Sequence, residues 1–246
     1  VEQSKWGGLG DQIEKEQITP YLVHGRPLDF TLEHEGQAIS GDIVAAGIHL
    51  LPTPKSNLEL QKKIVFNTEI EEFGYMGYVD LWLPQGGLPD AIGSSRARNS
   101  TPCIADIKTG NPRYWKTSKD LESDIQANMY ARWAFGALPA AEELDLAWIN
   151  FSTKKPYKAK TSHLRVTRAQ VTDRFAPIEA TACEIHEVRK RRLRTLDLPP
   201  NINACGDYNG CPYQHQCNLS PTQIIDAEAA TWLRREFRDS PTQPTK

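Results

Sequence analysis

Two acidic residues and a lysine lie inside short apolar segments, and their placement constrains this chain more than any other feature. Asp80 belongs to the apolar and aromatic segment 78–83, and Asp106 and Lys108 lie in or beside the apolar run 103–107. Such runs are typical of buried strands, where an ionised side chain is costly unless its charge is compensated. A divalent cation held by Asp80 and Asp106 would provide that compensation, because hard cations such as Mg²⁺ bind carboxylate oxygens.

Asp106 and Lys108 are two positions apart, so on a strand their side chains share one face of the sheet. Lys108 would then point at a water molecule on the bound metal or at a phosphate. Two acids, a lysine and a divalent cation are the groups needed for metal-assisted hydrolysis of a phosphodiester. The residues therefore predict a hydrolase that depends on Mg²⁺ or Mn²⁺.

Three short motifs follow one another around these residues. They are Gly77-Tyr78-Val79-Asp80, then Asp106-Ile107-Lys108-Thr109-Gly110, and then Gln126 and Tyr130 four positions apart in a predicted helix. In this order, on these predicted elements, they resemble the RecB-like exonuclease branch of the PD-(D/E)xK nuclease superfamily. A single Asp-x-Lys is common by chance, whereas the three motifs together are far more specific. The resemblance covers residues 62–217 well and the N-terminal part poorly.

The resemblance implies an α/β fold with a restriction-endonuclease-like core, in which helices flank a mixed central sheet spanning residues 60–166. It implies a deoxyribonuclease, and exonuclease action rather than site-specific cleavage, in phage or mobile-element recombination and repair. In this family pattern Asp80 and Asp106 bind the metal, with the Ile107 carbonyl as a further ligand. Lys108 orients the attacking water, and Gln126 and Tyr130 support the site.

The N-terminal segment 6–22 is predicted to be a helix that Pro20 ends or kinks. The similar nucleases usually present a histidine here, but this chain has Ile13 at the corresponding place. Glu14 and Glu16 are the remaining polar candidates. One of them could contribute to the metal site, or both could belong to a solvated acidic helix face.

A second helix is predicted over 121–135, because its apolar residues recur at steps of four. This stripe, which we expect to face the core, consists of Leu121, Ile125, Met129 and Trp133. Gln126 and Tyr130 lie on an adjoining face of the same helix.

Two basic segments are candidate DNA-binding surfaces. Arg113, Trp115 and Lys116 combine charge with an aromatic ring, as suits single-stranded nucleic acid. A long helix beginning at Thr167 ends in a basic run that could follow a phosphate backbone; we call this run, Arg189, Lys190, Arg191 and Arg192, the basic run. Either segment could instead be a solvated surface.

Three cysteines recur at equal intervals in a Gly- and Pro-containing segment that we call the cysteine loop: Cys205, Cys211 and Cys217. Such spacing indicates soft-metal ligation. Similar nucleases hold a [4Fe-4S] cluster there, but a cluster needs four ligands, and no cysteine precedes Cys103. A cluster with another fourth ligand, a zinc site that includes His215, and no metal all remain open. Cys103 and Cys183 are predicted to be packed thiols.

Length and composition are those of a globular protein: 246 residues, 39% hydrophobic, 24% charged and a net charge of −2. Near-neutral charge does not exclude DNA, because the distribution of basic residues matters more. We expect a nuclease core with an N-terminal helical part over 1–200, the cysteine loop packed on it over 201–222, and a C-terminal helix with a disordered tail over 223–246. Without a long apolar run or signal peptide, we expect no membrane contact and a cytoplasmic protein, and the resemblance makes a phage one source of its gene.

Other functions remain open at this stage. A non-cleaving nucleic-acid-binding module of the same fold is favoured by the missing histidine and fourth cysteine, and opposed by the intact Asp80, Asp106 and Lys108. A site-specific endonuclease is a further alternative. The last is a structural subunit whose cysteine loop docks a helicase or another recombination partner.

Overall fold

The computed structural model describes residues 5–53, 57–67, 73–89 and 100–193. The chain divides into two compact units, Val1–Cys183 and Glu184–Lys246. The first unit contains the sheet, and of the second only residues 184–193, which include the end of helix α5, are described. The predicted boundaries at 200 and 222 therefore lie outside the described residues, as do the cysteine loop and the tail. None of the helices in the described ranges combines the length and apolar character needed to cross a membrane.

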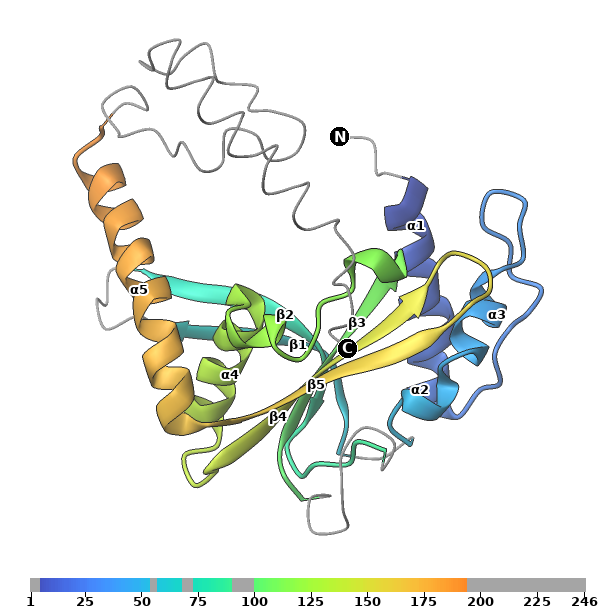
Figure 1. Cartoon of the computed structure of the whole chain (residues 1–246), viewed down its shortest axis with the longest axis horizontal. Helices are drawn as coiled ribbons and strands as arrows, with labels where there is room; N and C mark the ends of the chain where they lie inside the picture. The colour runs from blue at the N-terminus through green and yellow to red at the C-terminus, as the bar shows by residue number, and fades with distance from the viewer. Residues whose placement is uncertain (1–4, 54–56, 68–72, 90–99, 194–246) are drawn as a thin grey trace, which may run out of the picture. The chain divides into compact units, whose positions relative to one another are not determined.

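A mixed five-stranded sheet in the order β1-β2-β3-β4-β5 forms the centre of the first unit (Figure 1). Strands β3 and β4 are parallel, and the other neighbours are antiparallel. The strands are β1 (Glu59–Asn67), β2 (Gly74–Leu83), β3 (Cys103–Gly110), β4 (Glu143–Ser152) and β5 (Ala159–Thr167). The predicted α/β class and mixed sheet are confirmed.

Helices cover both faces of the sheet and create two apolar cores (Figure 1). The first core joins the sheet to the N-terminal helices through Leu9, Ile13 and Ile43, and the second joins it to the later helices through Tyr130 and Val171. The helical segments are α1 (Lys5–Gln12), the π-helical η1 (Ile13–Ile18), α2 (Thr19–His24), α3 (Ser40–Ala45), the short 3₁₀ turns η2 (Ile48–Leu50), η4 (Pro112–Tyr114) and η5 (Asp120–Glu122), α4 (Ile125–Ala137) and α5 (Arg168–Lys190). Because both faces of β4 are covered, all but its first residue are buried, as in parallel sheets.

Of the two predicted effects of Pro20, the first does not occur: the helix does not end there, because helical conformation continues to His24. The helix changes from the π-helical η1 to α2 directly before Pro20. Pro20 lies in the first turn of α2, where proline is tolerated best in a helix. The helix ends instead at Gly25, whose φ of 60° gives the left-handed cap that glycine adopts without strain.

The predicted apolar stripe on the second helix is only partly right: Leu121 is buried in the second core and Trp133 packs against it, but Leu121 precedes the helix and Ile125 does not face the core. Helix α4 begins only at Ile125, whose side chain is 60% exposed, after Asp124 caps it by accepting from the Ala127 N–H at 2.8 Å. The buried face is formed by Ala127, Tyr130, Ala131, Ala134 and Phe135. Small alanines let α4 lie close to the sheet, and this packing outweighs the spacing of the larger apolar residues.

Thr167 and Gln170 form a reciprocal capping box at the start of α5. The Thr167 N–H donates to Gln170 Oε1 at 2.9 Å, and the Gln170 N–H donates to Thr167 Oγ1 at 3.3 Å. Two backbone N–H groups that have no partner within the helix are satisfied in this way. The predicted start of the long helix at Thr167 is thereby confirmed.

Replacing this cap should weaken the domain. Thr167→Ala removes a side-chain cap, so we expect a loss of about 1 kcal/mol in the free energy of unfolding, measured by urea denaturation. Thr172→Ala is the matched control, because Thr172 only donates to the Arg168 carbonyl within α5, at 3.0 Å, and should change stability little. Equal losses in the two variants would contradict a capping role.

Candidate active site

Asp80 lies where the regular alternation of strand β2 breaks. Val79 packs in the core beneath α4, whereas Leu81 packs in the core beneath the N-terminal helices. In a regular strand, residues two positions apart share a face. On the neighbouring strand, Gln61 has a φ of 47°, and the ladder pairs Leu60 with Leu81 and Lys62 with Val79 but leaves Gln61 and Asp80 unpaired. Because of this irregularity, β2 contributes a buried side chain to each core. The side chain of Asp80, which lies between them, contacts polar groups instead.

Backbone and side-chain donors from two strands hold the Asp80 carboxylate. Its Oδ2 accepts from the Ile107 N–H on β3 at 2.8 Å, and its Oδ1 accepts from Gln61 Nε2 at 3.2 Å. The β2–β3 ladder ends at the pair Leu81 and Ala105, so the carboxylate takes the place of the next ladder partner. The N–H and C=O of a strand residue point toward the same neighbouring strand, which puts the Ile107 carbonyl on this edge of β3 as well.

Glu14 joins the same group from the N-terminal helix. Its Oε1 accepts a hydrogen bond from Gln61 Nε2, the nitrogen that also donates to Asp80. Glu14 lies in the π-helical segment η1, a conformation that occurs often at functional sites. Glu16 is exposed, and Ile13 is fully buried in the first core. Of the two predicted candidates, Glu14 is therefore the one that the fold brings to Asp80.

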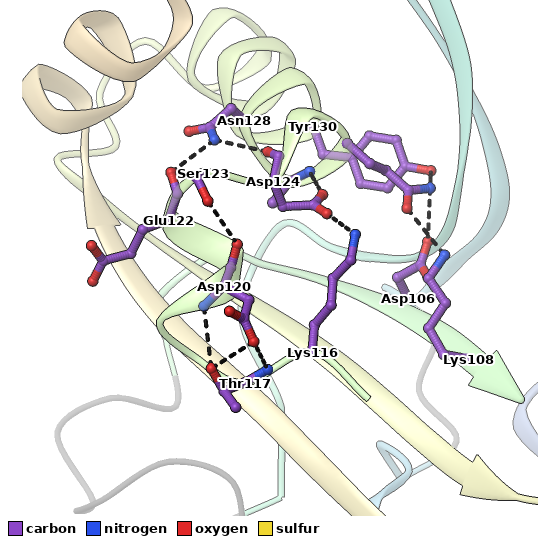
Figure 2. A network of polar contacts seen from close by, with 12 residues as sticks. Asp106, Lys108, Lys116, Thr117, Asp120, Glu122, Ser123, Asp124, Asn128 and Tyr130 are labelled. Atoms are coloured by element: carbon purple, nitrogen blue, oxygen red, sulfur yellow. Dashed lines mark hydrogen bonds and ion pairs between the residues drawn. The ribbon is translucent and has the colours of Figure 1, made fainter. Parts of the chain in front are cut away.

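A chain of polar contacts joins Asp106 and Lys108 to helix α4 (Figure 2). Lys108 Nζ lies 2.5 Å from Asp106 Oδ2 and donates to Gln126 Oε1 at 3.0 Å. Gln126 Nε2 donates to Asp106 Oδ1 at 3.3 Å and to the Tyr130 hydroxyl at 2.7 Å. That hydroxyl donates to the Tyr78 carbonyl at 2.5 Å. The Gln-x-x-x-Tyr pair thus fixes the positions of both the acid and the lysine.

Burial and mutual repulsion make the three acids reluctant to ionise. The pKa of Asp106 is raised to about 7, first by burial and then by the charge of Asp80, although Lys108 acts in the opposite direction. Burial also raises the pKa of Asp80, and burial together with the charge of Asp80 raises that of Glu14. Such a concentration of perturbed carboxyl groups is characteristic of functional sites.

The donor set suits a hard divalent cation. Asp106 Oδ2 is buried and accepts no hydrogen bond of good geometry from the described residues, and the Lys108 ammonium lies 2.5 Å from it. Glu14, Asp80, Asp106 and the Ile107 carbonyl offer oxygen atoms, which Mg²⁺ and Mn²⁺ prefer. In the described ranges, however, no three acidic, histidine or cysteine side chains already surround a metal-sized space. The Gln61 amide lies between two of the acids, and the Lys108 ammonium lies beside the third.

The predicted DNA-binding residues near α4 have different environments. Lys116 Nζ forms an ion pair with Asp124 Oδ2, the carboxylate that also caps α4 (Figure 2). Arg113 is exposed, and the Trp115 ring is partly buried with an Nε1 that has no hydrogen-bond partner among the described residues. Lys116 therefore has a structural contact that the sequence did not indicate, and its role toward DNA stays a prediction, as do those of Arg113 and Trp115.

The basic run lies in the second unit, where α5 ends at Lys190. Arg191 Nε lies 3.5 Å from Glu187 Oε2, one helical turn earlier, and Arg189 and Arg192 are exposed. Cys103 is a buried thiol whose pKa burial raises well above its usual value, and Cys183 is partly buried. The cysteine loop, including His215, lies outside the described residues, so a metal there stays a prediction.

Gln61 is the member of this site that the sequence did not indicate. It lies in an ordinary alternating strand segment, outside the three motifs. Only its place opposite Asp80 in an antiparallel pair could have signalled it, and that register follows from the fold.

Comparison with protein-family models and with curated protein sequences finds no match. Among solved structures, the chain is similar to a crystal structure of a protein from Eubacterium rectale that is named as a candidate exonuclease. The identity is 13%, the TM-score is 0.49, and the match covers 85% of this chain and 81% of that chain. A likeness at this level carries no argument about function, which must be argued from the site itself.

The raised pKa of Asp106 predicts how stability depends on pH in EDTA. The folded protein keeps this proton up to about pH 7, whereas the unfolded chain loses it near 3.8. Stability should therefore fall as pH rises between these values, because the folded state binds more protons. Asp106→Asn should flatten that fall, measured as melting temperature against pH from 5 to 8.

Asp145 provides a control of opposite sign. Burial would raise the pKa of Asp145, but hydrogen bonds from His163 and Arg165 hold it below its usual value. Its ionised form stabilises the fold, and that stability is lost as pH falls. Asp145→Asn should therefore lower the melting temperature most at neutral pH.

Parallel pH profiles of the melting temperature for wild type and Asp106→Asn would contradict the raised pKa assigned to Asp106.

Proposed function

We propose that this protein is a nuclease that hydrolyses phosphodiester bonds in DNA with the help of Mg²⁺ or Mn²⁺. The observation that carries the proposal is the convergence of Glu14, Asp80 and Asp106, from three separate elements, beside the ordered Lys108. Carboxylates alone would repel the phosphate, so their gathering has a use only if a cation intervenes. A bound divalent cation would polarise the phosphate and lower the pKa of a water molecule.

The groups of the chain have separate tasks in this proposal. Glu14, Asp80, Asp106 and the Ile107 carbonyl hold the cation. Lys108, fixed by Asp106 and Gln126, orients the attacking water and stabilises the negative charge that develops on the phosphate. Gln126 and Tyr130 keep that lysine and Asp106 in place, since the tyrosine is itself tied to the Tyr78 carbonyl.

Further features of the proposal rest on the motif resemblance. Exonuclease action is favoured over site-specific cleavage, and recombination or repair in a phage or mobile element is the proposed context. The cysteine loop would hold a [4Fe-4S] cluster or Zn²⁺, and a helicase or recombination protein would be a partner. These features stay predictions.

Removing Lys108 should abolish cleavage. Lys108→Ala should lower the rate by at least about a hundredfold, because the water loses its orienting cation. Asp106→Ala should do the same through loss of a metal ligand. Release of nucleotides from end-labelled DNA in Mg²⁺ and in Mn²⁺ measures the rate, and excess EDTA should stop the wild-type protein.

Lys62→Ala is the matched control for Lys108→Ala. The two lysine side chains are 39% and 38% exposed, and Lys62 also pairs with a carboxylate, Glu59, at 2.6 Å. Lys62→Ala should keep the wild-type rate. Wild-type rates for Lys108→Ala, or cleavage that survives metal removal, would refute the mechanism. DNA binding without cleavage in either metal would favour the non-cleaving module instead.

The basic run should contribute to DNA affinity through phosphate contacts. Replacing its four residues with alanine should weaken binding and flatten its dependence on salt, by about one unit of slope for each lost contact. Fluorescence anisotropy in EDTA measures binding without cleavage. In the matched control, lysine replaces Arg189, Arg191 and Arg192 and keeps the positive charge. Its slope of log affinity against log salt concentration should equal that of the wild type. An unchanged slope in the alanine variant would show that the run is a solvated surface.

A further inference from the structure

The Gln61 side-chain amide lies between two acids that belong to different elements. Its Nε2 donates to Asp80 Oδ1 at 3.2 Å and also to Glu14 Oε1, which is 47 positions away in sequence. Glu14 comes from the π-helical segment of the N-terminal helix, and Asp80 comes from β2. The amide is thus a direct polar link between the helix and the strand at the candidate active site.

The backbone at Gln61 is unusual for an exposed strand residue. Its φ of 47° lies in the left-handed region, which residues other than glycine rarely adopt. At the same position the β1–β2 ladder lacks a pair, although the residues on either side are paired. An exposed glutamine in a regular strand would have neither the strained backbone conformation nor the missing ladder pair. Strained residues of this kind gather at functional sites, where the surrounding contacts hold them.

A neutral donor is well suited to this position. Two carboxylates that converge on one point repel each other, and the amide hydrogens attract both of them. A lysine would do the same but would cancel a negative charge that a cation needs. Gln61 leaves the negative charge of Glu14 and Asp80 intact while holding one oxygen of each carboxylate beside the same nitrogen.

We propose that Gln61 is a positioning residue that holds Glu14 and Asp80 in the arrangement in which both bind one divalent cation. This inference rests on the proposed function for the identity of the ligand. It goes beyond the three motifs, because Gln61 belongs to none of them. It also gives a functional reason for the positive φ of this residue in β1. Gln61 acts through the two acids and is not itself assigned to the reacting atoms.

The experiment measures the affinity of the metal-free full chain for Mn²⁺, by electron paramagnetic resonance of the unbound ion. Gln61→Gly removes the amide and suits a positive φ, so the backbone should be kept. Gln61→Asn also tolerates this φ, but its amide is one methylene shorter. Both variants should weaken Mn²⁺ binding by about 10- to 100-fold, as is typical when a partner of a metal ligand is removed. Their melting temperatures should stay close to that of the wild type.

Two controls assign the effect to this site. Gln85→Ala should bind Mn²⁺ as the wild type does, because Gln85 is exposed and contacts Asn57 at 3.4 Å rather than the acids. Glu14→Gln should weaken binding, which shows that the measured ion occupies the acidic cluster. Wild-type affinity in Gln61→Gly, or an affinity that Glu14→Gln leaves unchanged, overturns the inference.

Failure of this inference can be told apart from failure of the proposed function. If Mn²⁺ affinity depends on Gln61 and Glu14 but no DNA is cleaved, the nuclease proposal fails and the positioning role stands. If DNA is cleaved and Gln61→Gly binds Mn²⁺ as tightly as the wild type, the positioning role fails and the nuclease proposal stands.

Discussion

The burial of Asp106 next to Asp80 is the interaction on which the rest of the site depends. Both carboxyl groups would prefer to be neutral, and burial with mutual repulsion raises the pKa of each. The fold keeps them together by surrounding them with donors: the Ile107 N–H, the Lys108 ammonium and the side-chain amides of Gln126 and Gln61. An arrangement that costs folding free energy in this way is understandable if the acids are there for a cation.

The scaffold explains why this arrangement can be rigid. Strand β3 pairs with β2 only as far as Ala105, but it pairs with β4 along its whole length, so the backbone of Asp106 and Lys108 is held by β4. On the neighbouring layer, Ala127, Ala131 and Ala134 let α4 approach the sheet closely. That approach brings Gln126 within reach of Asp106 and lets Tyr130 reach the backbone of β2. Packing of small apolar residues thus sets the geometry of the polar ones.

Much of the fold and half of the site could be predicted from local patterns. The strands around Asp80 and Asp106, the capped start of α5 at Thr167 and the place of Gln126 and Tyr130 on one helix all follow from periodicity and short motifs. The buried face of α4 could not be predicted in this way. Its alanines carry little hydrophobic signal, and Ile125 proved to be 60% exposed. Which residues of α4 are buried depends on which face of the helix can pack closely against the sheet.

Local sequence patterns were enough to place Asp80, Asp106 and Lys108 on strands, because apolar neighbours and a two-residue spacing are local properties. The packing of the elements was needed to show that Glu14 rather than Glu16 lies near Asp80, and that Gln61 links the two acids. The ion pair between Lys116 and the capping residue of α4 also depends on that packing. These contacts join residues from separate elements. Their existence depends on strand register and on how a helix lies over the sheet, which no local pattern specifies.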